Sequence, residues 1–353
     1  MQDFSTLRGR RVFLTGHTGF KGSWASLLLK VLGCEVVGYA LPPNTQPSLF
    51  ELASLRDTVA GHTLADIRDD EALANAMRVA RPDLVLHMAA QALVRQSYLS
   101  PRSTWETNTM GTVNVLEAVR KTPMVAAVVI VTTDKCYENR GWEWGYRETD
   151  ALGGHDPYSA SKAGAELVAH SYRQSFFGVS GPLVATARAG NVIGGGDWSD
   201  DRLIADAARA AASGQTLAIR NPGATRPWQH VLDCLSGYVS LAAALLQGDR
   251  ASATAYNFGP AAADNLTVGD LLTRLGSHWP ELRWHAEERT NAPREAMTLY
   301  LDSSRARSRL GWAPRWPLGV ALEKTAEWYR AVIGNPSQAR ALADRQIEDY
   351  LSS

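Results

Sequence analysis

Two short segments of this 353-residue chain carry side chains that can exchange protons. Tyr158-Ser-Ala-Ser-Lys162 places a phenol and an ammonium group four residues apart, on one face of a helix predicted over residues 158–176. A positive charge beside the phenol lowers its pKa, so that it can accept a hydroxyl proton near neutral pH. The pair therefore predicts acid–base chemistry, with Tyr158 as the base.

The second segment is Thr132-Thr133-Asp134-Lys135, which ends an apolar, β-branched stretch typical of a strand buried on both faces. Ligands bind at the carboxyl ends of parallel strands, so Thr133, Asp134 and Lys135 are candidates for the same site as Tyr158. Only six of the 36 basic residues are lysines, and two of those six lie in these segments. Their order and spacing favour a catalytic site.

A glycine-rich loop precedes both segments. Gly16, Gly19 and Gly22 follow a strand predicted over residues 11–14 and open a helix predicted over residues 19–32. Glycine permits the tight turn and lets backbone N–H groups approach a diphosphate, and the helix N-terminus adds partial positive charge. The loop predicts binding of a dinucleotide, although a merely tight turn is the alternative.

The identity of the dinucleotide depends on the second predicted strand. Residues 35–39 lead into Ala40-Leu41, without the acidic residue that commonly binds the adenosine ribose. No arginine follows directly, so NADP is not favoured; we expect NAD, with its affinity left open. Asp66 and Ile67 follow a third strand and are candidates for contacting the adenine, with a helix-capping role for Asp66 as the alternative.

Strands and helices alternate along the first half of the chain. The predicted strands are residues 11–14, 35–39, 62–65, 84–87, 126–132 and 183–188, and the predicted helices are 19–32, 69–79, 104–120 and 158–176. This alternation predicts an α/β fold with a doubly wound parallel (Rossmann) sheet.

The alternation weakens beyond Gly190, where glycines, prolines and tryptophans become frequent. We expect residues 1–189 to form an NAD-binding domain and residues 190–353 to form mainly a smaller, mixed substrate-binding domain. Part of 226–250, with a helix over 230–246, is expected to return to the first domain.

Composition excludes several classes of protein. The 36 basic and 36 acidic residues give no net field to hold nucleic acid or an anionic membrane. The N-terminus lacks the apolar core of a secretory signal, and no apolar run is long enough to span a bilayer. Three widely spaced cysteines predict neither a metal site nor disulfides. We expect a cytoplasmic protein.

Several motifs resemble those of the extended short-chain dehydrogenases/reductases that act on nucleotide sugars: the three glycines, His87-Met88-Ala89-Ala90-Gln91, Asn108, Thr133, Tyr158 and Lys162. Longer motifs are similar to the branch of 4,6-dehydratases that act on CDP-glucose. They are Thr133-Asp134-Lys135-Cys136-Tyr137-Glu138-Asn139-Arg140, Asp156-Pro-Tyr-Ser-Ala-Ser-Lys162, Arg188-Ala-Gly-Asn191-Val-Ile-Gly-Gly-Gly-Asp197-Trp198 and Arg226-Pro-Trp-Gln-His230. The resemblance runs from about residue 9 to residue 316.

The resemblance implies a lyase reaction with NAD in which no cofactor is consumed. Tyr158, assisted by Thr133, takes the sugar 4-hydroxyl proton while hydride leaves C4. Water is then eliminated across C5 and C6, with Asp134 protonating the departing hydroxyl, and hydride returns to C6. In the related dTDP-glucose enzymes a glutamate at the position of Lys135 removes the C5 proton. Lys135 would have to be neutral to do so, and stabilising the enolate or donating a proton with Asp134 are alternatives.

The resemblance also implies contact residues. For the cofactor they are Gly16, Gly19, Phe20, Gly22, Asp66, Ile67, Ala89, Ala90, Asn108, Thr132, Tyr158 and Lys162. For the substrate, whose diphosphate needs cationic and amide donors, they are Gln91, Asn191, Arg202, Arg220, Arg226 and Arg294. No metal is expected. Family members associate through helices of the first domain, so a homodimer or homotetramer is expected.

Three other functions remain to be weighed. A nucleotide-sugar 4-epimerase shares the tyrosine and lysine but needs no acid to expel a hydroxyl, so Asp134 favours dehydration. A dTDP-glucose 4,6-dehydratase is disfavoured by Lys135. A non-catalytic NAD-binding protein would not need the complete set of Thr133, Tyr158 and Lys162.

Overall fold

The computed structural model describes residues 4–178, 180–287 and 299–353. Its centre is a seven-stranded sheet in the order β10-β6-β5-β4-β1-β2-β3, and every pairing in it is parallel. The strands are β1 (Arg11–Thr15), β2 (Glu35–Ala40), β3 (Gly61–Leu64), β4 (Leu84–His87), β5 (Ala127–Val131), β6 (Leu183–Ala189) and β10 (Ala255–Phe258). The predicted doubly wound parallel sheet is confirmed.

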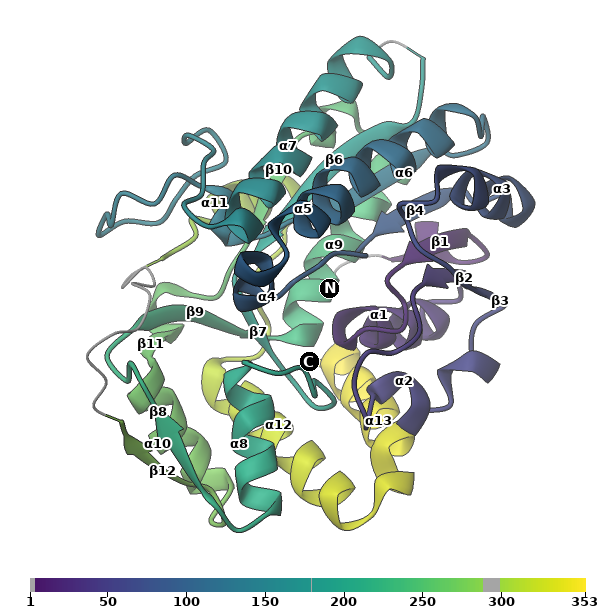
Figure 1. Cartoon of the computed structure of the whole chain (residues 1–353). Coiled ribbons are helices and arrows are strands. Elements are labelled where there is room, and N and C mark those ends of the chain that lie inside the picture. Colours follow the sequence, from purple (N-terminus) through teal and green to yellow (C-terminus); the bar gives the residue numbers. More distant parts are fainter. Residues whose placement is uncertain (1–3, 179, 288–298) are drawn as a thin grey trace.

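Helices cover both faces of this sheet (Figure 1). One face packs against α3 (Asp70–Ala80), α6 (Gly111–Arg120) and α7 (Pro157–Ser175), and the other packs against α1 (Phe20–Val31) and α9 (Val231–Leu246). All five residues of β5 are buried, as its continuous apolar sequence predicted. A parallel sheet needs this double cover because its strands expose apolar side chains on both faces.

The helix predicted over residues 104–120 is interrupted. It consists of α5 (Pro101–Trp105), a π-helical turn (Glu106–Met110) and α6, and a short helix α4 (Val94–Leu99) precedes it. A π turn rotates the side chains that follow it relative to a regular helix and is frequent at functional sites. Here it contains the buried Asn108.

The chain beyond residue 190 forms two small sheets. β7 (Asn191–Ile193) and β11 (Asn265–Thr267) flank β9 (Thr225–His230), and β8 (Thr216–Ile219) pairs with β12 (Arg283–Ala286). Besides α9, the helices in this half of the chain are α8 (Leu203–Ala212), α10 (Val268–His278), α11 (Ser304–Leu310), α12 (Leu318–Gly334) and α13 (Ala339–Ser352). In Figure 1 the small sheets and α8, α10, α12 and α13 lie below the main sheet, whereas α11 lies near β10.

Three elements from this second half lie with the main sheet. α9 packs against β5 and β6, β10 extends the sheet beside β6, and α11 packs against β10 and α9. The helix was predicted over residues 230–246, whereas β10 was not predicted. The division into domains at residue 189 stays a prediction.

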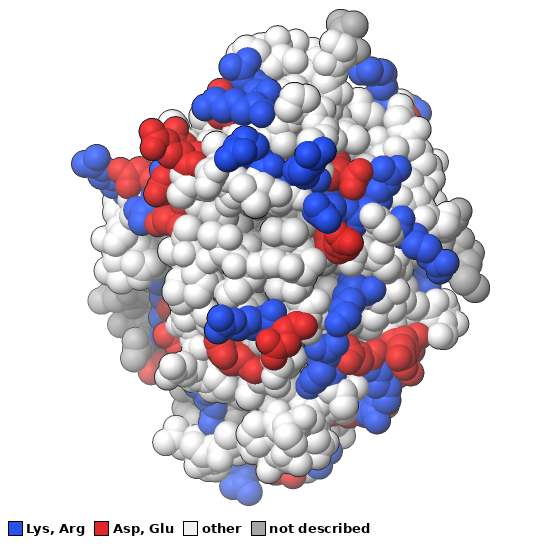
Figure 2. Space-filling model, turned by 90° about the vertical axis from the view of Figure 1, so that its right-hand side faces the viewer, with Lys and Arg blue, Asp and Glu red and all other residues white. Residues whose placement is uncertain are grey.

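The surface carries charges of both signs. Figure 2 shows basic and acidic side chains interspersed around an uncharged central area, with neither sign forming a continuous field on that face. Within the described residues, no helix is both long and apolar enough to cross a bilayer.

Helix α13 is hydrogen-bonded to α9 through a buried carboxyl group. Asp233 Oδ1 accepts hydrogen bonds from the Tyr350 hydroxyl at 2.8 Å and from the backbone N–H of Arg315 at 2.6 Å, whereas Oδ2 has no partner among the described residues. Burial raises the pKa of Asp233 from 3.8 to about 6. The charged carboxylate is therefore less stable in the folded protein than in the unfolded chain.

We predict that Asp233→Asn stabilises the protein at neutral pH. The cost of the charge appears as pH rises from 3.8 to about 6 and stays constant above that range. The variant keeps the Oδ1 acceptor, so its advantage in free energy of unfolding should grow from near zero below pH 4 to at most about 3 kcal/mol at pH 8. Urea unfolding across this range measures the difference, and a gap that does not change with pH would contradict the prediction.

Candidate active site

The glycine loop lies against the loop that follows β4. Gly16 has φ +80°, and a Cβ atom there would lie 2.8 Å from the backbone nitrogen of Ala89. A Cβ at Gly22, in the first turn of α1, would lie 2.0 Å from the Gly16 carbonyl oxygen, and Gly19 is the residue that precedes the helix. Only glycine fits at Gly16 and Gly22, and the backbone of the turn stays open to a diphosphate at the start of α1.

Hydrogen bonds at the ends of β1 and β4 fix this arrangement. The Thr15 hydroxyl accepts the backbone N–H groups of Met88 and Ala89, both at 3.1 Å, and bonds to His87 Nδ1 at 2.7 Å. Burial lowers the pKa of His87 to about 3, so its ring is a neutral link between the strands. Ala89 and Ala90 follow directly and are half-buried.

Asn108 connects this loop to the helix that carries the predicted catalytic pair. Its Oδ1 accepts the Gln91 N–H at 2.8 Å, and its Nδ2 donates to the Gln91 carbonyl oxygen at 3.0 Å and to Ser161 Oγ at 2.9 Å. Gln91 also donates to Thr104 Oγ1 at 3.0 Å through its side chain. Asn108 thus sets the distance between the β4 loop and α7.

Helix α7 begins at Pro157 and brings Tyr158 and Lys162 to the end of β5. The Asp156 side chain caps it by accepting the Ser159 N–H at 2.9 Å. Lys162 Nζ donates to the carbonyl oxygen of Val131 at 3.0 Å. Burial, and secondarily the charge of Lys21, lower the pKa of Lys162 to about 8.

Tyr158 is buried beside Thr133. Burial raises the pKa of its phenol, and the Thr133 side chain and the charge of Arg202 act in the opposite direction. The sequence predicted that a neighbouring positive charge lowers this pKa, whereas the structure raises it. Within the chain itself, burial outweighs the groups that favour the phenolate.

Asp134 is the buried acid of the site. Thr133 Oγ1 donates to Asp134 Oδ1 at 3.0 Å, and Oδ2 has no partner among the described residues. Burial raises the pKa of this carboxyl, in spite of opposing effects from Lys135, Thr133, Arg226 and Lys21. Such a group can hold a proton at a pH at which an exposed aspartate has lost it.

The structure places the remaining candidates in different surroundings. Phe20 opens α1, and the end of its ring lies near Gly194. Ile67 is buried, and Asp66 forms an exposed ion pair with Arg68 at 2.6 Å. The Thr132 hydroxyl donates to Glu166 and its backbone N–H donates to the Ala187 carbonyl oxygen, so both of its donors are used within the protein.

Among the substrate candidates, Arg226 is buried, and its charge favours the ionised form of Asp134. The charge of Arg202 favours the ionised form of Tyr158, and its guanidinium group donates to the Ala92 carbonyl oxygen at 3.1 Å. Asn191 is half-buried at the start of β7. Arg220 is exposed after β8, and no contact described for it joins it to the other candidates. Arg294 lies outside the described residues.

Sequence reasoning missed two residues of this neighbourhood. Lys21, in the glycine loop, affects the pKa values of both Asp134 and Lys162, and its place among only six lysines was the available signal. Glu166, one turn after Lys162, forms a buried ion pair with Arg188 at 2.8 Å. The signal for Glu166 was a carboxylate four residues after Lys162, on the same face of α7.

Comparison with known proteins agrees with this geometry. Residues 13–325 match the family model described as GDP-mannose 4,6 dehydratase. The CDP-glucose 4,6-dehydratase of Salmonella typhimurium is 47% identical, with 100% of this chain and 99% of that protein covered. The dTDP-glucose 4,6-dehydratase of Xanthomonas campestris is 26% identical over 90% of this chain and 92% of its own length.

Solved structures show the same fold. Epimerase Mth375 of Methanothermobacter thermautotrophicus has a TM-score of 0.80 at 22% identity, covering 95% of this chain and 96% of that one. The dTDP-glucose 4,6-dehydratase DesIV of Streptomyces venezuelae, solved with NAD and TYD bound, has a TM-score of 0.73 at 26% identity, covering 92% and 98%. Because the family model spans most of the chain and a relative 47% identical matches it from end to end, the chain belongs to the GDP-mannose 4,6 dehydratase family, within the extended short-chain dehydrogenases/reductases.

Proposed function

We propose that this protein is a lyase that converts CDP-glucose to CDP-4-keto-6-deoxyglucose with NAD as its cofactor. The observation that carries the proposal is the buried Asp134 beside Thr133 and Tyr158, because its pKa is raised and its Oδ2 has no hydrogen-bond partner among the described residues. Oxidation at C4 needs only the tyrosine and the lysine, whereas expulsion of a hydroxyl group needs an acid. The identity of 47% with a CDP-glucose 4,6-dehydratase supports CDP-glucose as the substrate.

The residues present fit NAD. The open backbone of the glycine loop and the start of α1 suit its diphosphate. Gly16 lies directly against Ala89, so the loops after β1 and β4 are side by side where the cofactor would bind. When bound, NAD supplies the acceptor for the C4 hydride and later the donor of the hydride to C6. Ile67 and Asp66 would lie at the adenine, and Ala90, Asn108 and the Thr132 backbone would line the path to the nicotinamide.

Tyr158 accepts the proton of the sugar 4-hydroxyl group in this proposal. Its phenol interacts with the Thr133 side chain, and Thr133 hydrogen-bonds the same sugar oxygen. The buried ammonium group of Lys162 favours the phenolate electrostatically, and its hydrogen bond to Val131 holds it in place.

Asp134 donates its proton to the hydroxyl group that leaves C6, so that the group departs as water. The proton at C5 is removed in the same step, which leaves a double bond between C5 and C6. Addition of a hydride at C6 and a proton at C5 then gives the 4-keto-6-deoxy sugar. We assign Lys135 to this step, either as the base at C5 or as the charge that stabilises the enolate. Burial supports the role of Asp134 because it favours the protonated carboxyl.

Arg226, Arg202 and Asn191 are proposed to bind the substrate diphosphate, with Arg220, Gln91 and Arg294 as further contacts. Arg226 and Arg202 influence the pKa values of Asp134 and Tyr158, so a diphosphate held by them would lie close to the reacting sugar. Lys135 favours CDP-glucose over dTDP-glucose. A location in the cytoplasm remains a prediction.

Incubation of the protein with CDP-glucose and NAD is predicted to produce the alkali-dependent absorbance of a 4-keto sugar. Tyr158→Phe should lower this turnover by at least about 10²-fold, because it removes the proposed general base at the 4-hydroxyl group. An unchanged melting temperature would show that the variant is folded. An epimerase or a non-catalytic protein would give no signal, and a stronger signal with dTDP-glucose would contradict the base preference.

Asp134→Asn is predicted to separate the two steps. The amide still accepts the Thr133 hydrogen bond but cannot donate a proton to the leaving group, so elimination should slow by about 10²- to 10⁴-fold while oxidation at C4 continues. Nicotinamide absorbance should therefore reveal NADH that accumulates on the enzyme. Equal slowing of both steps would remove the acid role from Asp134.

We also propose that the chain associates at least as a homodimer through α4, α5 and α7. Exposed apolar side chains gather there: Tyr98, Leu99, Trp105 and Leu167, with Leu99 78% exposed. Trp105 packs over Gly164, on the same helix as Leu167. These helices contact one another, so they present one surface (Figure 1).

We predict that sedimentation of the wild type shows a dimer or tetramer and that Leu167→Glu is a monomer. The substitution places a charge on the proposed interface, where burying it without a partner would be costly. Leu64→Glu, on the exposed edge strand β3, is the matched control and should leave the assembly intact. A wild-type monomer at micromolar concentration would overturn the proposal.

A further inference from the structure

One buried ion pair holds both ends of the turn that carries Asp134 and Lys135. The residue before the turn segment 133–136 is Thr132, whose hydroxyl donates to Glu166 Oε1 at 2.5 Å. The residue after it is Tyr137, whose hydroxyl accepts from Arg188 Nη1 at 2.8 Å. Glu166 and Arg188 therefore act from opposite ends of the same segment.

The two partners are bonded to each other in a bidentate geometry. Arg188 Nε donates to Glu166 Oε1 at 2.9 Å, and Arg188 Nη2 donates to Oε2 at 2.8 Å. Their side chains are only 4% and 3% exposed. Because an apolar pair of similar volume is often as stable as a buried ion pair, stability alone does not explain these charges.

The catalytic helix belongs to the same unit. Glu166 follows Lys162 by four residues in α7, so the two side chains lie on one face of the helix. Lys162 bonds to the Val131 carbonyl oxygen and Glu166 bonds to the Thr132 hydroxyl, so adjacent residues of the β5 end are held by consecutive turns of α7.

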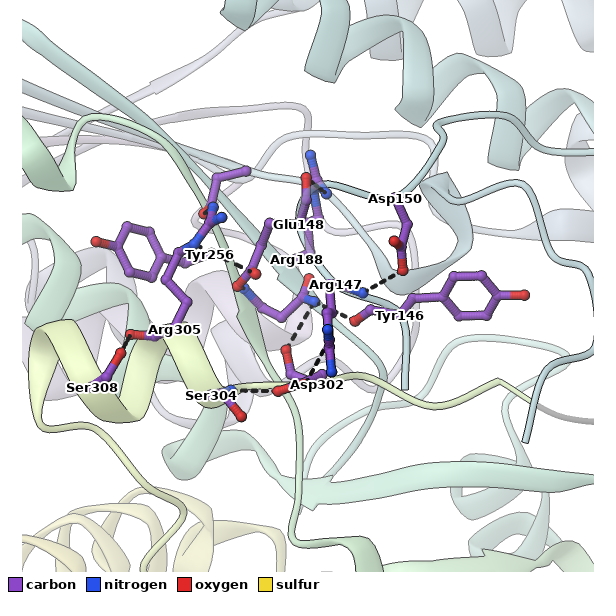
Figure 3. A network of polar contacts seen from close by, with 12 residues as sticks. Tyr146, Arg147, Glu148, Asp150, Arg188, Tyr256, Asp302, Ser304, Arg305 and Ser308 are labelled. Atoms are coloured by element: carbon purple, nitrogen blue, oxygen red, sulfur yellow. Dashed lines mark hydrogen bonds and ion pairs between the residues drawn. The ribbon is translucent and has the colours of Figure 1, made fainter. Parts of the chain in front are cut away.

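The network continues to Glu148, in the loop that follows the turn, and to Asn257 in β10. Arg188 Nη1 also donates to the Glu148 carbonyl oxygen at 3.4 Å, and the Tyr137 hydroxyl donates to Asn257 Oδ1 at 2.7 Å. Figure 3 shows Arg188 next to Glu148, with Arg305 on the other side of that carboxylate. Glu148 Oε1 in turn accepts the Asn257 N–H at 2.9 Å.

We propose that Glu166 and Arg188 are positioning residues for the elimination step. They fix the segment 133–136 relative to Tyr158 and Lys162, so that the acid and the base meet one sugar ring. Neither residue touches the substrate, and the inference rests on the proposed dehydratase function. Because a shift of about 1 Å in a reacting group costs about 10²-fold in rate, a small loosening of this segment would be measurable.

Two threonines provide a matched test. The Thr132 and Thr186 hydroxyls both donate to Glu166, at 2.5 Å to Oε1 and at 2.7 Å to Oε2, and both residues are buried. Only Thr132 adjoins the catalytic turn, since Thr186 lies within β6. Thr132→Val and Thr186→Val thus remove the same kind of bond from the same carboxylate. Tyr137→Phe removes the bond at the Arg188 end.

We expect Thr132→Val and Tyr137→Phe to lower the elimination rate by about 10- to 100-fold, with NADH accumulating and with KM and NAD affinity within about twofold of wild type. Thr186→Val should keep normal turnover. Equal loss of turnover in Thr132→Val and Thr186→Val, or a loss explained by weaker NAD binding, would overturn the proposal.

Hydrogen exchange in the protein without ligands provides a readout that does not depend on the reaction. Faster exchange in peptides covering residues 133–138 is expected in Thr132→Val and Tyr137→Phe but not in Thr186→Val. If no nucleotide sugar is dehydrated by the wild type, the proposed function fails while this comparison still tests the positioning. Unchanged exchange in all three variants would refute the proposed positioning role of Glu166 and Arg188.

Discussion

The hydrogen bond from Lys162 Nζ to the Val131 carbonyl oxygen joins helix α7 to the end of β5, and the arrangement of the site depends on it. Burial lowers the pKa of the Lys162 amino group, and a buried amino group needs a polar partner. The Val131 carbonyl oxygen provides that partner without adding a negative charge. The strand that carries Thr133 and the helix that carries Tyr158 are thereby fixed to each other.

A parallel sheet determines where this contact lies. All seven strands end at the same edge, so the glycine loop after β1, the Ala89 loop after β4 and the Asp134 turn after β5 meet although they are far apart in sequence. Asn108 and His87 connect these loops through neutral hydrogen bonds. The site is thus assembled from the loops that follow the strands and from polar residues at the strand ends, such as Thr15 and His87.

Buried ionisable groups are concentrated around the end of β5. Asp134, Lys162, Glu166 and Arg188 are all nearly inaccessible to solvent. Burial raises the pKa of Asp134 and lowers that of Lys162, whereas Arg188 and nearby hydroxyl groups overcome the effect of burial on Glu166 and lower its pKa. Asp134 Oδ2 has no hydrogen-bond partner among the residues that the structure describes, whereas both oxygens of Glu166 accept hydrogen bonds. These different surroundings suit the proposed roles of Asp134 as an acid and of Glu166 as a positioning residue.

The sequence by itself determined six of the seven strands of the main sheet, because buried strands, helix spacing and glycines leave signals within short stretches of chain. It also provided Tyr158, Lys162, Thr133 and Asp134 as candidates, because their types and spacing lie within two local motifs, and the structure brings these candidates together at the end of β5. Tertiary structure alone decided that β10 completes the sheet, since its four residues resemble many short apolar runs. The ion pair between Glu166 and Arg188 and the approach of Lys21 to Asp134 were likewise decided by folding. A partner twenty or a hundred residues away leaves no periodicity, and the pKa of a carboxyl group depends on burial that only the packed chain creates.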